Sequence, residues 1–281
     1  MTLTTLAEAI DRHVRDGACV ALEGFTHLIP FAAGHEIIRQ GRRGLHLVRM
    51  TPDLVYDQLI GMGCAARLTF SWGGNPGVGS LHRLRDAVEH GWPTTLELDE
   101  HTHAGLAAAY CAGAARLPFG LLRGYLGTDL ATANPRIRRI ECPFTGEHLA
   151  AVPAVNPDVT ILHAQRADRR GNVAIEGIVG AQREAAFAAR ALVVTVEQIV
   201  DELPPAMNGI VLPHWIVSAV AHCPGGAYPS YAQGHYARDN AFYQRWDAIA
   251  RERDAFAAWM QRHVLASRDH AAFLASLREA A

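Results

Sequence analysis

Short apolar runs alternate with amphipathic segments along the first part of the chain. Residues 18–22 form a continuous apolar run of strand length, and residues 45–50 predict the next strand. Residues 32–40 and 81–88 instead space their apolar side chains three and four apart, which is typical of a helix. This alternation predicts an open, mainly parallel sheet with helices on both faces. In such sheets, ligands bind beyond the carboxyl ends of the strands.

The pattern changes toward the end of the chain. Residues 137–142 and 148–152 predict an antiparallel pair, and residues 158–164 predict a buried strand. From about residue 235 to 281 the pattern is helical and more charged. We therefore expect a single domain, residues 1–281, that ends in a helical C-terminal extension.

Two stretches have a less regular pattern. Residues 117–135 show little periodicity, so we expect them to wrap the surface. The sequence Thr51-Pro52-Asp53 predicts the start of a helix, with Thr51 as the N-cap and Pro52 in the first turn.

A glycine-rich turn, Phe70–Gly79, stands between a predicted strand and a predicted helix. Its glycines permit positive φ angles and leave main-chain N–H groups open to a ligand at the positive end of a helix dipole. This arrangement suits an anion, an oxyanion or a thioester carbonyl, although a tight turn without a ligand would look the same. The turn Gly24-Phe25-Thr26-His27 also follows a predicted strand. The two turns are therefore expected to share one cleft.

The segment Asp99-Glu100-His101-Thr102-His103 follows a short alternating strand and precedes an alanine-rich helix. Its carboxylates and imidazoles are candidates for acid–base chemistry. The structural alternative is that Asp99 or Thr102 caps the helix and that the other side chains are solvated.

The composition narrows the function classes. A formal net charge of −2 creates no global field that would attract nucleic acid or an anionic membrane. No apolar run reaches the ~18 residues of a membrane span, and the N-terminus lacks the features of a signal peptide. The five cysteines form no CxxC pair, and the histidines have no metal-ligand spacing. We therefore expect a cytoplasmic protein with neither a disulfide framework nor a metal site.

Several segments carry a resemblance to the α subunits of the class I coenzyme A transferases. Asp16–Pro30 is similar to the family's signature, except that Glu23 replaces the first glycine of a Gly-Gly-Phe motif and a later glycine is absent. His163–Asn172 looks like the family's His-Ala-x-x-Ala-Asp-x-x-Gly-Asn segment. These two departures point to the branch of the glutaconate and 3-oxoadipate transferases. Residues 70–77 and 224–231 are also similar to segments of that branch.

This resemblance implies a NagB/RpiA-like α/β fold and a heteromeric enzyme, commonly of two α and two β subunits. It implies transfer of CoA from succinyl-CoA, or a similar acyl-CoA, to a short dicarboxylic acid such as 3-oxoadipate. CoA is then a substrate, and no permanently bound cofactor is expected. The attacking glutamate belongs to a Ser-Glu-Asn-Gly-like segment of the β subunit. This sequence lacks that segment, so we expect no catalytic residue in this chain.

The chain would then supply the other wall of the cleft. Main-chain N–H groups of the two turns would stabilise the tetrahedral oxyanion. The far carboxylate of the acid needs a cation, for which Arg49, Arg83 and His27 are candidates. The expected substrate- and CoA-binding residues are Gly24, Phe25, Thr26, His27, Ser71, Gly73, Gly74, Asn75, Gly77 and Glu100.

Two other functions stay open. A hydrolase branch of the superfamily cleaves CoA thioesters of ring-derived intermediates with an α-subunit carboxylate, and Glu100 falls where that group would lie. The fold family also includes sugar-phosphate-binding regulators. Those carry a DNA-binding module and a basic patch, neither of which is visible in this sequence.

Overall fold

The computed structural model describes residues 2–76, 78–205 and 208–279. Its main sheet has ten strands. The bounds of these strands are β1 Thr2–Leu3, β2 Cys19–Glu23, β3 Leu45–Arg49, β4 Ala65–Phe70, β5 Glu97–Glu100, β9 Val159–Asp168, β10 Val173–Glu176, β11 Ala191–Val200, β12 Gly209–Leu212 and β13 Ala219–His222.

The order along the sheet is β1-β13-β11-β9-β2-β3-β4-β5, and every neighbouring pair on this path is parallel. Strands β10 and β12 leave the path and pair antiparallel beside β9. This topology confirms the open, mainly parallel sheet that the alternating pattern predicts.

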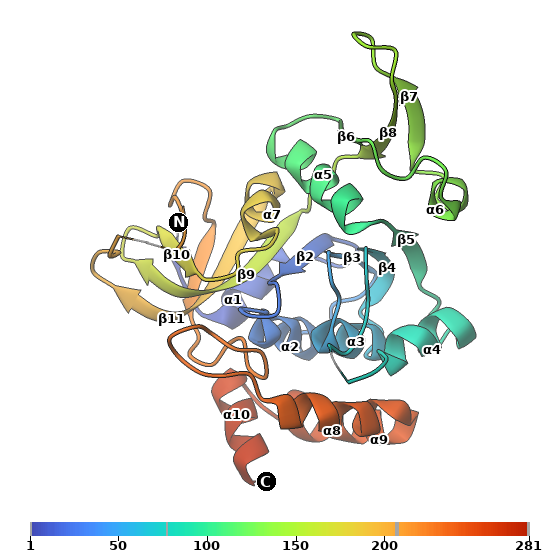
Figure 1. The fold of residues 1–281 in the computed structure, drawn as a ribbon. Helices are drawn as coiled ribbons and strands as arrows, with labels where there is room; N and C mark the ends of the chain where they lie inside the picture. Colours follow the sequence, from blue (N-terminus) through green and yellow to red (C-terminus); the bar gives the residue numbers. More distant parts are fainter. Residues whose placement is uncertain (1, 77, 206–207, 280–281) are drawn as a thin grey trace.

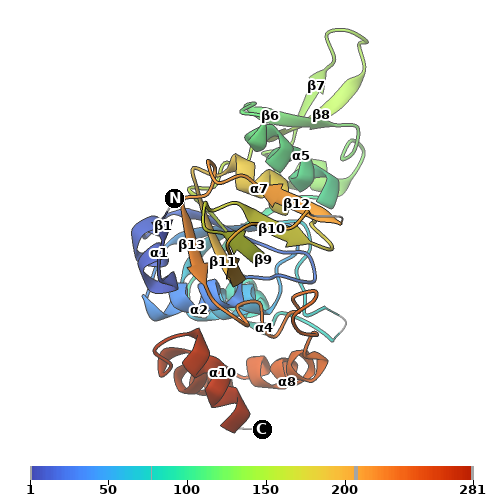
Figure 2. The same ribbon diagram turned by 90° about the vertical axis from the view of Figure 1, so that its left-hand side faces the viewer.

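Helices cover both faces of this sheet (Figures 1 and 2). The helices are α1 Leu6–His13, α2 Phe31–Arg39, α3 Leu54–Gly61 and α4 His82–His90 on one face, and α5 His103–Ala114 and α7 Gln182–Ala188 on the other. Within β2, Val20 and Leu22 pack into the core of the first group, whereas Ala21 points the opposite way and packs with α5 and α7. Because β2 is buried on both faces, its residues form a continuous apolar run.

The helix expected to start at Thr51 begins instead at Leu54, with Asp53 at the N-cap position. The carboxylate of Asp53 pairs with Arg49 at 3.2 Å, and both side chains are buried. The prediction of Thr51 as the cap is therefore wrong, because a buried ion pair with the end of β3 fixes this helix start.

A second sheet of three strands projects from the body of the molecule (Figure 1). It contains the predicted antiparallel pair, β7 (Arg138–Glu141) and β8 (His148–Pro153). Residues 117–135, expected to wrap the surface, are mostly exposed and form β6 (Phe119–Leu122) and α6 (Asp129–Ala133). Their low periodicity gave no sign of β6, because β6 depends on pairing with β8, about thirty residues later in the chain.

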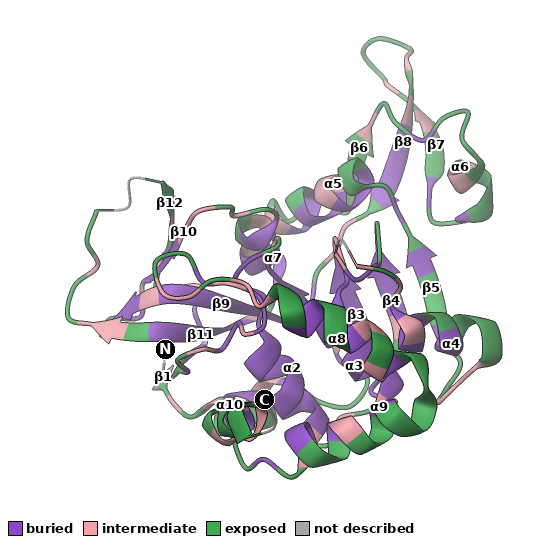
Figure 3. Cartoon of the chain, turned by 60° about the horizontal axis from the view of Figure 1, so that its bottom comes forward, coloured by how far each residue is buried: buried purple, intermediate pink, exposed green. Residues whose placement is uncertain are grey.

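The C-terminal extension is helical, as predicted. It comprises α8 (Asn240–Arg251), α9 (Arg253–Trp259), the π-helix η1 (Met260–Leu265) and α10 (His270–Glu279). Figure 3 shows that its helices turn an exposed side outward and a buried side toward α2 and α3. The side chains of Trp246, Phe256 and Phe273 complete the core of that helical layer.

Candidate active site at the strand ends

The carboxyl ends of β2, β3, β4 and β5 meet at one edge of the sheet. In the register, Arg49 of β3 lies beside Phe70 of β4, and Phe70 lies beside Glu100 of β5. The turn after β2, the glycine-rich turn after β4 and the segment after β5 therefore leave the sheet from the same edge.

A cavity of about 190 Å³ opens at this edge, and we call it the strand-end cavity. Phe25 and Thr26 line it from the first turn, and Trp72 and Pro76 from the glycine-rich turn. The rest of the wall is Ile29, Arg49, Thr51, Asp53, His103, Arg238 and Tyr243. Of the expected site residues, Gly24, His27, Ser71, Gly73, Gly74, Asn75 and Glu100 lie outside this wall. Gly77 lies outside the described residues.

The main chain of the glycine-rich turn is largely satisfied within the protein. Gly74 N–H donates to the Pro52 carbonyl at 3.2 Å, and Asn75 N–H donates to the Gly79 carbonyl at 3.0 Å. The expectation that Gly74 offers a free donor is therefore wrong. A Cβ at Gly74 would lie 2.6 Å from the ring of Trp72. A side chain there would displace the indole, which packs against this backbone and forms part of the cavity wall.

Two polar side chains of this turn also point into the protein. The Ser71 hydroxyl donates to the Met50 carbonyl at 2.6 Å. The side-chain N–H of buried Asn75 donates to the Tyr243 carbonyl at 2.9 Å, which ties the turn to α8. These two residues therefore hold the turn in place.

The turn after β2 has a strained main chain. Thr26 and Leu28 have φ angles of 62° and 53°, which residues with a side chain rarely adopt. A Cβ at Gly24 would lie 2.7 Å from the Leu28 carbonyl oxygen, so only glycine fits this turn. No hydrogen bond to the main-chain N–H of Phe25 or Thr26 is found among the described residues. Backbone strain of this kind clusters at functional sites, and here it leaves two donors beside the cavity.

Arg49, Arg83 and His27, which were expected to bind the far carboxylate of the acid, already have partners within the protein. Arg49 pairs with Asp53 and donates to the Gly24 carbonyl at 2.8 Å. Arg83 is buried at α4, where it pairs with Asp86 at 3.1 Å and donates to the Arg251 carbonyl.

His27 is likewise buried, and its Nε2 lies 3.1 Å from the Glu176 carbonyl oxygen. Burial also lowers the pKa of this imidazole. Neither Arg83 nor His27 lines the strand-end cavity.

Arg238 is a cavity residue that the sequence analysis missed. Its guanidinium lies 3.9 Å from the centre of the Tyr243 ring, and it donates to the Pro76 carbonyl at 2.9 Å. Its buried Nε has no hydrogen-bond partner, and no described carboxylate pairs with it. No local pattern marks this arginine, because it comes from a loop more than 150 residues after the glycine-rich turn.

The acid–base candidates at the end of β5 and directly after it have different surroundings. Asp99 is buried and pairs with Arg67 at 2.8 Å and with His101 at 3.1 Å. Burial alone would raise the pKa of Asp99, but hydrogen bonds from His101 and its neighbours hold it well below the usual range. Thr102 caps α5 by accepting from the Gly105 N–H. Glu100 is exposed at the same edge.

The described residues contain no cluster of three or more His, Cys, Asp or Glu side chains that could hold a metal ion. In the same part of the chain, no helix has the length and apolar character needed to cross a membrane.

Comparison with known proteins agrees with this architecture. The family model for coenzyme A transferases matches residues 3–222. The chain is 65% identical to the A subunit of 3-oxoadipate CoA-transferase from Pseudomonas knackmussii, over 99% of this chain and 98% of that protein.

Two further relatives matter for the site. The crystal structure of glutaconate coenzyme A-transferase from Acidaminococcus fermentans covers 99% of this chain and 93% of its own, with 29% identity and a TM-score of 0.90. The cholesterol ring-cleaving hydrolase IpdA subunit of Rhodococcus jostii is 29% identical over 62% of this chain and 61% of its own. The extent of the family match shows that this chain belongs to the coenzyme A transferase family.

Proposed function

We propose that this chain is the A subunit of a CoA-transferase that moves CoA from succinyl-CoA, or a similar acyl-CoA, to 3-oxoadipate. The 65% identity to the A subunit of a 3-oxoadipate CoA-transferase, over nearly the whole chain, carries this proposal. CoA enters as a substrate, and the reaction requires no permanently bound cofactor. The five free cysteines support a reducing compartment, so we place the enzyme in the cytoplasm.

The chain needs a partner because the strand-end cavity has no free carboxylate on its described wall. Asp53 is the one carboxylate there, and it is 1% exposed and paired with Arg49. Burial also raises the pKa of Asp53. Attack on a thioester requires an accessible, ionised carboxylate. We therefore assign the nucleophilic glutamate to a β subunit that closes this cavity.

The main-chain donors of the first turn suit the tetrahedral intermediate. When the nucleophile attacks the thioester carbonyl, negative charge develops on its oxygen. The N–H groups of Phe25 and Thr26 are free beside the cavity and held by a strained turn. Fixed donors of this kind stabilise an oxyanion by about 3 kcal/mol each. Of the two turns expected to stabilise the oxyanion, this proposal assigns the role to the turn after β2.

Arg238 supplies the cation for the far carboxylate of the acceptor acid. The charge of Arg49 is neutralised by Asp53, whereas Arg238 has no carboxylate partner among the described residues. Its position on the cavity wall and its charge, which no described carboxylate neutralises, suit the carboxylate of an acceptor acid. The ring of Tyr243 fixes the plane of that guanidinium.

Reconstitution tests the proposed function. The purified chain, its β partner and the mixture would be assayed for CoA transfer from succinyl-CoA to 3-oxoadipate and to glutaconate. We expect transfer by the mixture alone and a preference for 3-oxoadipate. Turnover by the chain without its partner would refute the claim that this chain lacks the nucleophile. A preference for glutaconate would refute the claim that 3-oxoadipate is the acceptor.

A thioester hydrolase is the second candidate, because Glu100 is exposed at the carboxyl end of β5 and the chain resembles a ring-cleaving hydrolase subunit. A hydrolase would release CoA without an acceptor acid and would lose most activity in Glu100→Gln. A transferase would show neither property.

A further inference from the structure

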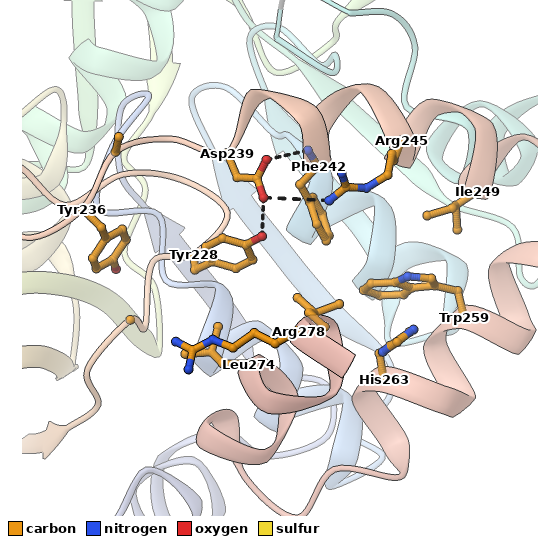
Figure 4. Close-up of a pocket in the computed structure, with 13 residues that line it drawn as sticks. Tyr228, Tyr236, Asp239, Phe242, Arg245, Ile249, Trp259, His263, Leu274 and Arg278 are labelled. Atoms are coloured by element: carbon orange, nitrogen blue, oxygen red, sulfur yellow. Dashed lines mark hydrogen bonds and ion pairs between the residues drawn. The ribbon is translucent and has the colours of Figure 1, made fainter. Parts of the chain in front are cut away.

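A second, larger cavity lies among the C-terminal helices (Figure 4). We call it the C-terminal pocket. Its volume is about 760 Å³, within the ~300–1,000 Å³ of typical small-molecule sites. All of its lining residues lie between Gly225 and Arg278, beyond residues 3–222 that the family model matches. The transfer chemistry proposed above uses none of them.

Aromatic and aliphatic side chains form most of the wall. Phe242 packs edge to face against Tyr228 and against Trp259, with ring centres 5.9 Å apart in both pairs. Ile249, Leu274 and Leu277 complete this apolar surface. Aromatic rings arranged in this way accept another ring at an edge or a face.

Two arginines bring positive charge to the pocket. Figure 4 shows Arg245 reaching in from α8 and Arg278 from α10. Asp239 is the one carboxylate on the described wall, and it already accepts from the Tyr228 hydroxyl and the Phe242 N–H. Arg245 approaches it only to 3.9 Å, and Arg278 pairs with no described carboxylate. The pocket therefore complements an anion, and arginine suits a carboxylate in particular.

The backbone beside the pocket is also unusual. Trp259, the last residue of α9, and His263, in the middle of the π-helix η1, both line the wall. Such segments are rare and occur often at functional sites. His263 Nδ1 lies 3.0 Å from the Ser276 hydroxyl, a contact that joins η1 to α10.

The first turn of α8 separates this pocket from the strand-end cavity. Arg238 and Tyr243 line the strand-end cavity, whereas their neighbours Asp239 and Phe242 line the C-terminal pocket. A ligand that shifts this turn would therefore move Arg238 relative to the glycine-rich turn.

We propose that the C-terminal pocket binds a small aromatic carboxylic acid, and that binding changes the rate of CoA transfer through the first turn of α8. The binding rests on the pocket alone, whereas the effect on rate rests on the proposed function.

The experiment uses the reconstituted complex of both subunits, with 4-phenylbutyrate as the probe and 4-phenylbutanamide as its neutral match. We expect calorimetry to show saturable binding of the acid and at least about tenfold weaker binding of the amide. The double variant Arg245→Ala/Arg278→Ala should weaken binding of the acid by about tenfold or more. Arg262→Ala is the matched control, because Arg262 is exposed on the same π-helix and does not line the pocket.

Circular dichroism would confirm that each variant is folded, and Arg278→Gln gives a milder second variant. Equal binding of acid and amide, no effect of the arginine variants, or no binding by the complex would overturn the site. Binding without a change in transfer rate would overturn the coupling. Binding to a complex that lacks transferase activity would support the site and contradict the proposed function.

Discussion

The strand-end cavity and the C-terminal pocket share the first turn of α8 but are built from different parts of the chain. The strand-end cavity lies where parallel strands end, and its walls include a strained turn and a glycine-supported indole. The C-terminal pocket lies between helices and is walled by side chains. Main-chain donors held by a sheet edge suit chemistry that needs fixed positions, whereas helix side chains suit recognition of a ligand.

The two cavities also differ in how much of their lining falls within residues 3–222, which the family model matches. Most of the strand-end cavity comes from residues 25–103, inside the matched range. Arg238 and Tyr243 lie beyond it, yet they complete the same cavity. The residues proposed to select the acceptor acid are therefore separate from those proposed to stabilise the intermediate, so one can change without the other.

The largest effect is expected from Arg238→Met. Removing the one cavity cation without a carboxylate partner among the described residues should lower kcat/KM for 3-oxoadipate about 100-fold, equivalent to ~3 kcal/mol. For a monocarboxylate acceptor of equal length the loss should be much smaller, because the contact at the far end is absent. Steady-state kinetics of the complex would measure both values.

Arg238→Lys serves as the matched control, since it keeps the charge but loses the planar guanidinium. Equal losses for the dicarboxylate and the monocarboxylate would contradict the assignment of Arg238 to the far carboxylate. Unchanged binding of 4-phenylbutyrate by Arg238→Met would show that the Arg238 side chain is not itself a ligand contact of the C-terminal pocket.

A smaller effect is expected at Glu197, beneath the C-terminal pocket. Its carboxylate pairs with His163 at 2.6 Å and accepts from the Tyr236 hydroxyl at 2.7 Å and the Gly225 N–H at 2.9 Å. Burial would raise the pKa of Glu197, but these partners hold it below its usual value. A carboxylate whose pKa is lower in the folded state stabilises the fold at neutral pH.

Glu197→Gln should therefore lower the free energy of unfolding by about 2 kcal/mol at pH 7. That difference should shrink as the pH falls below about 4.5, where the unfolded-state carboxylate becomes protonated. Urea titrations at pH 7 and pH 4 would measure it. The control is Glu89→Gln, whose exposed pair with Arg85 should contribute little. A constant difference at both pH values would contradict the role of the charge.

The smallest effect is expected from Gly74→Ala. The added Cβ would lie 2.6 Å from the Trp72 ring, and the half-exposed indole can move away. We expect about a tenfold fall in kcat/KM with little loss of stability, because one wall of the strand-end cavity is displaced. Gly124→Ala is the control, since its Cβ would meet only Leu122 at 3.5 Å. Equal rates for both variants would show that the position of Trp72 does not affect the reaction.

The sequence by itself determined the sheet, the helices on both its faces and the sheet edge at which the strand-end cavity opens. Period and apolar runs are local properties, and in β2 five consecutive residues are enough to indicate burial on both faces. The helical extension and the segments similar to the family could likewise be recognised from short stretches of sequence. The same local view failed for β6, whose partner strand lies about thirty residues away in the sequence.

Only the tertiary structure decided which groups are free to act. The sequence offered Gly74, Arg49, Arg83 and His27 on residue type, but each is occupied by a partner that no local pattern reveals. Arg238 reaches the cavity because α8 packs against the glycine-rich turn through Asn75 and Tyr243. The chemical identity of a side chain is fixed by sequence, whereas its remaining hydrogen-bonding capacity depends on neighbours that only folding brings together.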